Sequence, residues 1–173
     1  MARFKNRWIL VEFIPINKST TQGNPGGGTA ELGKPSNSGS LTLDGKKIWN
    51  SLRQSVASNF GDTGWGKVGL SLTVKYFSPM TNLCIIRVAR DQHNIAWAAL
   101  TLLSSIDGMA YIPNVIHVSG TIKHAQLAAI AHNRIVVARY RALSKMPVQT
   151  LVQNDGLETY LETSEKEINA MQD

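Results

Sequence analysis

Apolar residues recur along this chain with two different periods, and each period predicts a different kind of element. Residues 8–14 are mostly β-branched or aromatic, the side chains that fit a pleated strand, and Pro15 ends the run. Residues 67–77 alternate between apolar and polar side chains, which predicts a half-buried strand. Its buried face would carry Val68, Leu70, Leu72, Val74 and Tyr76. After the turn SPMTN, the apolar residues 82–90 are expected to pair with this strand as a hairpin.

Helical spacing appears first between residues 45 and 61. Apolar side chains recur there every four residues, at Ile48, Leu52, Val56 and Phe60. Thr42 or Asp44 can serve as the N-cap of this helix, and Gly61 is expected to end it.

Two further helices are predicted in the second half of the chain. The first starts near Asp91, is apolar on most sides and ends around Gly108. A strand over residues 114–121 follows, and a long helix over residues 122–145 closes before Pro147. The resulting order, β-α-β-β-α-β plus a C-terminal helix, is the split arrangement of a ferredoxin-like (RNP-like) α/β sandwich with an antiparallel sheet, in the α+β class. Both faces of residues 82–90 are apolar, so the outer face of the sheet should also be covered, by the last helix or by a partner.

The composition of residues 16–43 differs from that of the rest of the chain. Six glycines, two prolines and many small polar residues predict a flexible insertion in a single domain of residues 1–147. The sequence GTAELGK at residues 28–34 resembles the start of a phosphate-binding loop, but Pro35 follows where a magnesium-binding Ser or Thr is required. Chance in a glycine-rich segment is the better explanation.

The net charge of +6 is unevenly distributed. Residues 151–173 hold six acids and one base, a net of −5, so residues 1–150 carry 17 bases against 6 acids, a net of +11. We therefore predict an acidic tail at residues 148–173 behind a basic body that attracts polyanions, nucleic acid being the commonest soluble candidate. Charge that serves only solubility is the simpler alternative.

The N-terminal cations Arg3, Lys5 and Arg7 precede a strand, not an export signal or a mitochondrial presequence. The apolar run after them is short and interrupted by Glu12, and its residue types favour a strand over a helix. Because strand side chains alternate, the three cations would share one surface. No segment approaches the roughly 18 apolar residues that a bilayer requires, so we expect a soluble domain.

The last predicted helix also carries a basic stripe. At 100° per residue, Lys123, Arg134 and Arg141 fall on one side, and Ile122, Ala129, Val136 and Leu143 on another. A solvated helix face is as good an explanation as a ridge that tracks phosphates. The strand-to-helix turn at residues 117–124 offers Gly120 and helix-start amides to a phosphate, although such turns usually only cap.

Catalysis by the protein itself is not indicated. Cys84 lies in an apolar run and is expected to be a buried, inert thiol. The four histidines lack the spacing of a zinc site, and no carboxylate pair stands out. The sheet also lacks the alternating aromatic residues with which some RNA-binding domains stack bases, so recognition should be electrostatic and shape-based.

Three segments together resemble a known family. MARFKNRWILVE, LTVKYFSPMTNLCIIRVAR and NVIHVSGTIKHAQLAAIAHNR are similar, in this order, to the small Pop-type protein subunit shared by ribonuclease P and ribonuclease MRP. The resemblance covers roughly residues 1–15 and 44–145. It does not extend to residues 16–43 or to the acidic tail.

This resemblance implies a non-catalytic subunit of a ribonucleoprotein. The RNA subunit, with bound Mg2+, would remove the 5′ leader of precursor tRNA or cleave precursor rRNA, and the protein would brace its catalytic core near the leader without binding a cofactor itself. The implied partners are a barrel-fold protein subunit and a second small sandwich-fold subunit, in the nucleus and nucleolus, with no membrane. The implied RNA contacts are Arg3, Lys5, Arg7, Lys75, Arg87, Arg90, Lys123, Arg134 and Arg141.

The alternative from another class is a ferredoxin-like regulatory or adaptor module that binds a small anionic ligand or a protein partner. It would account for the fold and the apolar outer face of the sheet. It leaves the net charge of +11 over residues 1–150 and the three matched segments unexplained. An enzyme that acts alone ranks third.

Overall fold

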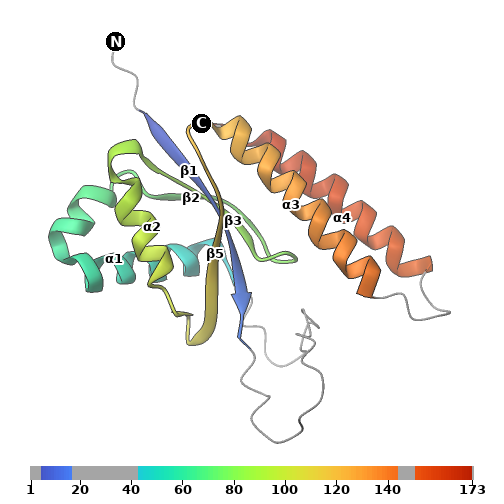
Figure 1. The fold of residues 1–173 in the computed structure, drawn as a ribbon, viewed down its shortest axis with the longest axis horizontal. Coiled ribbons are helices and arrows are strands. Elements are labelled where there is room, and N and C mark those ends of the chain that lie inside the picture. The colour runs from blue at the N-terminus through green and yellow to red at the C-terminus, as the bar shows by residue number, and fades with distance from the viewer. Residues whose placement is uncertain (1–4, 17–42, 144–150, 173) are drawn as a thin grey trace, which may run out of the picture.

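The computed structural model describes residues 5–16, 43–143 and 151–172, with the backbone alone at residues 140–143 and 151–155. Its centre is a five-stranded sheet in the order β2-β3-β1-β5-β4, in which neighbouring strands are antiparallel. Helices α1 and α2 lie on one face, which we call the inner face, and α3 and α4 lie on the other, the outer face (Figure 1). The four long strands have the order of a ferredoxin-like sandwich, which confirms the predicted fold class.

Strand β1 (Asn6–Pro15) runs through the middle of the sheet, between β3 and β5. Its side chains alternate between two cores. Trp8 and Leu10 are buried on the outer face, whereas Ile9, Val11 and Phe13 are buried on the inner face. A strand that is buried on both sides accounts for the nearly continuous apolar run in the sequence.

Helix α1 (Gly45–Val68) begins where the four-residue spacing predicts, and the Asp44 carboxylate accepts a hydrogen bond of 2.7 Å from the Gly45 amide. The helix is kinked at Gly61, whose φ of 65° and ψ of −170° lie outside the helical range. Gly61 therefore ends the first helical segment as predicted, but a second segment continues to Val68. The predicted start of the next strand at residue 67 is wrong, because residues 67 and 68 complete this helix and residues 69–71 form a turn.

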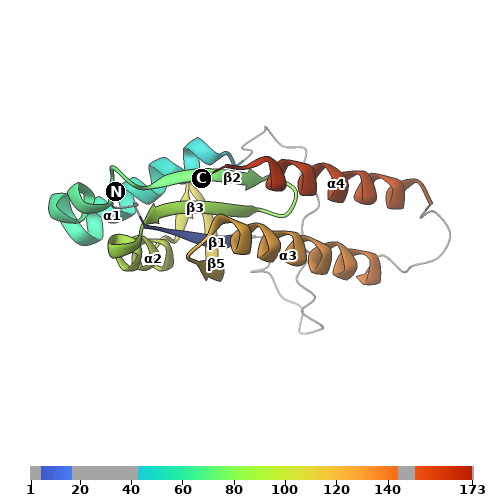
Figure 2. The same cartoon turned by 90° about the horizontal axis from the view of Figure 1, so that it is seen from above.

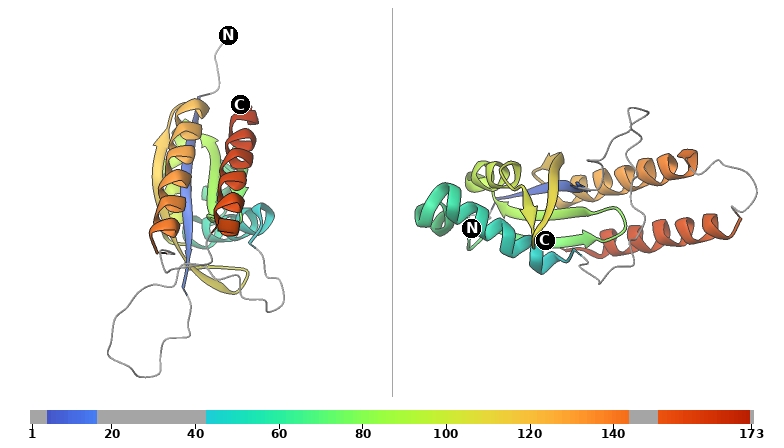
Figure 3. Two further views of the ribbon diagram at one scale, coloured as in Figure 1. Left: turned by 90° about the vertical axis from the view of Figure 1, so that its right-hand side faces the viewer. Right: turned by 90° about the horizontal axis from the view of Figure 1, so that it is seen from below.

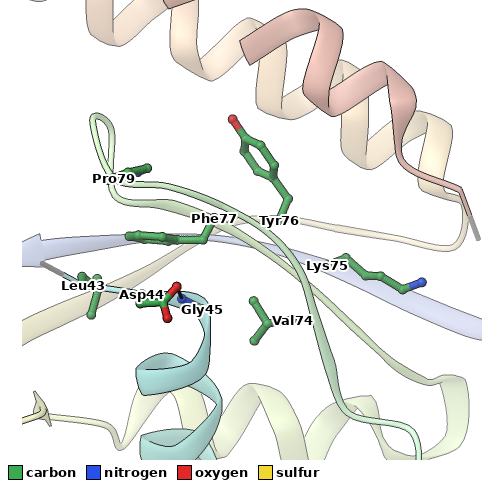
Figure 4. Close-up of a pocket in the computed structure, with 8 residues that line it drawn as sticks. All are labelled: Leu43, Asp44, Gly45, Val74, Lys75, Tyr76, Phe77 and Pro79. Atoms are coloured by element: carbon green, nitrogen blue, oxygen red, sulfur yellow. Dashed lines mark hydrogen bonds between the residues drawn. The ribbon is translucent and has the colours of Figure 1, made fainter. Parts of the chain in front are cut away.

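Strand β2 (Thr73–Ser78) is shorter than predicted, and the predicted buried face is not a single face. The register between β2 and β3 (Leu83–Ala89) shifts between Val74 and Tyr76, so the side chains of these two residues lie on opposite faces. Val74 packs in the inner core, and Tyr76 points toward α3 and α4 (Figure 4). Leu70, predicted to be buried, is 99% exposed in the turn before the strand.

Helix α2 (His93–Thr101), preceded by the short 3-10 helix η1 (Arg90–Gln92), ends well before Gly108. The predicted end is wrong because residues 105–119 form a hairpin of β4 (Ser105–Ile106) and β5 (Met109–Ser119). Asp107 and Gly108 form its turn, with φ values of 50° and 80°. Two positive φ angles are typical of a tight hairpin turn, for which Asp-Gly is a preferred sequence.

Helices α3 (Ile122–Leu143) and α4 (Leu151–Ala170) lie side by side over the outer face (Figure 2, Figure 3). The expected cover of this face is thus confirmed for α3. A helix was not predicted for residues 148–173, where the sequence indicated only an acidic tail. The buried outer core comprises Trp8, Leu10, Tyr76, Leu83, Ile85, Ala125, Ala129 and Ile168.

The structure does not test the predictions made for the glycine-rich insertion. Residues 17–42 of the expected insertion, including the phosphate-loop-like residues 28–34, lie outside the described residues. Of the helices in the described ranges, none combines the length and apolarity that a membrane crossing needs.

Candidate nucleic-acid interface

Four elements meet at one end of the sheet, where β1 begins, β3 and β5 end and α3 starts. The register fixes this arrangement, because Asn6 pairs with Ala89 and Trp8 pairs with Ser119. The backbone amide of Arg90 also donates a hydrogen bond of 2.8 Å to the carbonyl of Lys5. Five of the predicted RNA contacts lie at this end, which we call the basic end: Lys5, Arg7, Arg87, Arg90 and Lys123.

Arg7 lies over the turn that joins β5 to α3. A Cβ atom at Gly120 would lie 3.2 Å from Nη1 of Arg7, so the guanidinium packs directly against the glycine backbone. Nη1 also approaches the Asn6 carbonyl at 3.3 Å. The close approach explains why a glycine suits position 120, since a larger residue would displace the arginine.

The first turn of α3 contributes the positive end of its helix dipole to the same surface. The Thr121 hydroxyl accepts from the His124 amide at 3.4 Å, and the Ser119 hydroxyl accepts from the Thr121 amide at 3.0 Å. Local side chains therefore cap part of this helix start, as is usual for such turns. Lys123 in the first turn is exposed and adds a full charge.

Arg90 and Lys75 already have contacts within the chain. Nε of Arg90 lies 3.2 Å from Oδ1 of Asp91, in an exposed ion pair of the kind that contributes little to stability and is readily exchanged for another anion. Nζ of Lys75 donates to the carbonyl of Gln172 at 3.5 Å, just beyond the end of α4. Lys75 thus lies at the margin of the basic end, beside the C-terminal helix.

The structure does not bring Arg134 to the basic end. Eleven residues of helix, about 16 Å, separate it from Lys123. Its Nε and Nη2 atoms donate to Oε1 of Glu165 at 3.0 and 2.7 Å, so its charge is paired with α4. Arg3 and the side chain of Arg141 lie outside the described part of the chain.

A hollow of about 560 Å³ lies beside the edge strand β2. Its lining includes the apolar side chains of Leu43, Val74, Phe77 and Pro79 (Figure 4). Asp44 also lines it, and the carboxylate of Asp44 caps α1. Lys75 is the cation at its rim. One lysine beside a capping carboxylate gives this hollow little means to hold a small anion.

Among the remaining titratable side chains, Cys84 is buried, and Glu12 and His132 are partly buried as a pair. Burial raises the pKa of the Cys84 thiol far above its ordinary value, which agrees with the inert thiol that the sequence predicted. His132 pairs with Glu12, with 3.4 Å between Nε2 and Oε2. No three His, Cys, Asp or Glu side chains of the described residues converge as metal ligands would.

Sequence reasoning missed one cluster of aromatic and basic side chains, formed by Trp49, Arg53 and Trp65 on α1. The four-residue spacing of Trp49 and Arg53 was a signal for their contact. The approach of Trp65 had no such signal, because it depends on the kink at Gly61.

The family model described as the Rpp14/Pop5 family matches residues 7–130. The match includes most of the basic end and stops before α4. A Schizosaccharomyces pombe protein named ribonuclease P/MRP protein subunit POP5 is 45% identical over 134 residues, which cover 78% of this chain and 89% of that protein. The protein of the same name from Saccharomyces cerevisiae is 34% identical over 136 residues, which cover 77% of this chain and 78% of that protein.

Among solved structures, a chain of the cryo-EM structure of yeast ribonuclease MRP aligns with 99% of this chain and 99% of its own length. The sequence identity is 10% and the TM-score 0.48, a similarity too weak to argue from.

Proposed function

This chain belongs to the Rpp14/Pop5 family, and from that membership we propose that it is a protein subunit of ribonuclease P and ribonuclease MRP. The observation that carries the proposal is the 45% identity to a relative that bears this subunit name, over 89% of the relative's length. The charge of the body and the cations of the basic end are consistent with a partner made of RNA. The alternative of a regulatory or adaptor module has no support from these relatives.

The role that we propose for the basic end is to hold the backbone of the RNA subunit in a fixed geometry. Lys5 and Arg7 lie at the start of β1, Arg90 directly follows β3, and Lys123 is in the first turn of α3. Strand pairing and the start of α3 set the relative positions of these elements. Cations on such a rigid frame contact phosphates at fixed spacings, which positions a folded RNA without reading its sequence.

We further propose that the protein is non-catalytic in the particle. Hydrolysis of precursor tRNA at its 5′ leader, and cleavage of precursor rRNA in the related particle, would be the work of the RNA subunit and its Mg2+. In this scheme the side chains of the protein brace the RNA and lie near the leader, and they hold neither a metal nor a nucleophile.

The proposed partners and location follow from the same assignment. A barrel-fold protein subunit and a second small sandwich-fold subunit would share the particle, in the nucleus and nucleolus. Imaging of a tagged chain together with a nucleolar marker tests the location, and mass spectrometry of the purified particle tests the protein partners.

The central experiment is purification of the tagged full chain from its own cells at moderate salt, followed by sequencing of the bound RNA. We expect one or two discrete structured RNAs and an endonuclease activity that removes the 5′ leader of a precursor tRNA. Digestion of the RNA in the purified particle before the assay should abolish cleavage. The same digestion of a control purification from untagged cells should leave its cleavage activity unchanged. Recovery of the chain without any discrete RNA would overturn the proposal.

A further inference from the structure

We propose that the side of α1 that carries Trp49, Arg53 and Trp65 is a second RNA contact, which binds single-stranded RNA through these three residues. This inference rests on the proposed function for the identity of the ligand. We call these three residues the arginine-tryptophan cluster. None of them belongs to the basic end.

The cluster is a compact arrangement of one guanidinium and two indoles. The guanidinium carbon of Arg53 lies 5.3 Å from the ring centroid of Trp65 and 6.0 Å from that of Trp49, both within reach of a cation–π interaction. The two indole centroids are 5.8 Å apart and their planes meet at 80°. Nε1 of Trp49 donates to the carbonyl of Leu72 at 3.3 Å, which fixes that ring to the start of β2.

The kink in α1 creates this contact. In a straight helix Trp65 would lie twelve residues beyond Arg53, about 18 Å away. The conformation of Gly61, with φ of 65° and ψ of −170°, redirects the second helical segment so that Trp65 returns to the side of Trp49. Such a backbone conformation is accessible essentially to glycine alone, and backbone conformations of this kind cluster at functional sites.

The charge of Arg53 is available to a ligand. Within the described ranges Arg53 has no carboxylate partner, and its side chain is exposed while the two indoles hold its guanidinium in place. Lys46 lies seven residues earlier, about 20° away on the same face of α1. Lys67, in the second segment, is also exposed. Arg53 is thus the cation in contact with the two half-buried indoles, and Lys46 and Lys67 are exposed on the same two helical segments.

This combination favours RNA over a protein partner. Proteins that bind single strands without base reading combine cations that follow the backbone with aromatic rings on which bases stack, and an arginine held against an aromatic ring keeps its N–H edge for phosphate. The backbone of Gly69 lies against the Trp65 ring. Leu70 is the next residue and is 99% exposed, so its side chain extends the apolar part of the surface. A protein partner is the competing occupant, which the experiment must separate.

The test measures binding of a fluorescently labelled ten-nucleotide oligouridylate to the full chain by anisotropy, and the quenching of tryptophan fluorescence by the unlabelled oligonucleotide. Arg53→Gln should weaken binding at least about fivefold, since it removes the cation that the two indoles hold for the phosphate backbone. Arg53→Lys should also weaken it, because lysine keeps the charge but not the planar stack. Trp49→Phe should remove a large part of the quenching.

Two matched controls report on other surfaces of the chain. Trp97→Phe changes the tryptophan of α2, which is 42% exposed, and Arg139→Gln changes an exposed cation of α3. Both should bind oligouridylate as the unaltered chain does.

Unchanged affinity in Arg53→Gln, or quenching that disappears with Trp97→Phe instead, would overturn the inference. So would an Arg53→Gln chain that binds oligouridylate normally but loses a protein subunit from the purified particle, since that outcome assigns the surface to a protein. Failure of the chain to co-purify with a particle RNA would refute the proposed function without affecting this measurement.

Discussion

At the residue scale, the pair of Glu12 and His132 couples the central strand to the helix that covers it. Glu12 is on the outer face of β1, His132 is on α3, and their side chains are 20% and 14% exposed. The hydrogen-bonding interaction with His132 is the main cause that lowers the pKa of Glu12, and the charges of His132 and Arg139 and a hydrogen bond from Asn114 act in the same direction. Burial opposes them by raising the pKa, but the net shift is downward.

Because the folded-state pKa of Glu12 is depressed, its contribution to stability is present above the unfolded-state pKa and is lost as the pH falls through the folded-state value. Glu12→Gln should lower the free energy of unfolding at neutral pH by about 1–2 kcal/mol, since it weakens a partly buried interaction. The variant should also lose less stability on acidification than the unaltered chain does. Urea unfolding over a pH series from neutral to acid tests both expectations.

Glu162→Gln on the exposed side of α4 is the matched control for this pH series. Its unfolding curves should follow those of the unaltered chain at every pH. Equal acid sensitivity in Glu12→Gln and in the unaltered chain would show that the pair does not contribute in this way.

The positions of basic residues were predictable from the sequence where they follow from strand alternation or from a hairpin. Alternation along β1 predicted that Lys5 and Arg7 would lie together, and the hairpin of β2 and β3 carried Arg87 and Arg90 to the same end. The ion pair of Arg134 with Glu165 was not predictable in this way, because Glu165 lies on a helix that the sequence pattern did not reveal.

At the element scale, α4 is attached to the rest of the fold mainly by polar contacts. The Ser164 hydroxyl lies 3.0 Å from the Tyr76 hydroxyl and accepts from Nδ2 of Asn133 at 2.9 Å. Nε2 of Gln126 donates to the carbonyls of Ile168 and Met171 at 2.7 and 3.2 Å. Ile168 is the large apolar side chain of the described part of α4 that is fully buried.

Ile168→Ala should loosen α4 without unfolding the sheet. Removing a buried isoleucine costs about 2–5 kcal/mol when the surroundings cannot relax, but here the helix can detach instead. Hydrogen exchange should therefore speed up in residues 156–170 while the amides of β1 stay protected. Lys166→Ala, at an exposed position of the same helix, should leave both regions unchanged. Equal loss of protection in β1 would show that α4 is an inseparable part of the core.

Two of the three glycines in the second half of α1, Gly61 and Gly66, give a matched pair for the kink. A Cβ at Gly61 or at Gly66 meets no atom within 4 Å, so sterics with neighbours do not distinguish them. Gly61→Ala should destabilise the chain by about 1–3 kcal/mol, because its positive φ strains an alanine. Gly66→Ala, in helical conformation, should stabilise it by up to about 1 kcal/mol. Thermal unfolding of the two variants tests this, and a change of the same sign in both would contradict the account of the kink.

The periodicity of apolar residues predicted the long helices and strands well. Local irregularities account for the strand face, the hairpin and the helix that it did not predict. The bulge in β2 reversed the face of Tyr76, since a shift of one residue exchanges the two faces of a strand. The Asp-Gly turn at residues 107–108 was a hairpin signal, but the apolar residues before it favoured a longer helix. Helix α4 lacked a strong apolar stripe, because its docking uses hydroxyl and amide groups.

At the scale of the whole molecule, charge is separated between the body and the C-terminal helix. Residues 151–170 carry five acids and one base, a net of −4, and they pack against a body that is strongly basic. The basic end lies where α3 starts, at the end of the sheet where β1 begins. The division of charge between the body and the tail was predictable from the sequence, whereas the packing of the acidic segment as a helix over the outer face required the fold.

Replacing Lys5, Arg7 and Lys123 together with glutamine should weaken binding of the RNA that co-purifies with the chain, with little effect on unfolding. Each lost phosphate contact should reduce the slope of log affinity against log salt by about 0.7–0.9, so the combined loss is roughly 2–3. Filter binding over a salt series measures this slope. Arg139→Gln with Lys166→Gln removes two exposed cations elsewhere and should leave the slope unchanged. An unaltered slope in the triple variant would exclude the basic end as the RNA contact.

The central position of β1 also has a consequence for synthesis on the ribosome. This strand emerges before its neighbours β3 and β5, which are made only after about 70 and 100 further residues, a delay of roughly 4 to 20 s at ordinary rates of translation. Trp8, Ile9, Leu10 and Val11, all buried in the finished fold, are exposed to other nascent chains during that time. Charges that flank such a segment suppress its aggregation. Lys5, Arg7 and Glu12 would therefore act as gatekeepers for the nascent chain before any RNA is bound.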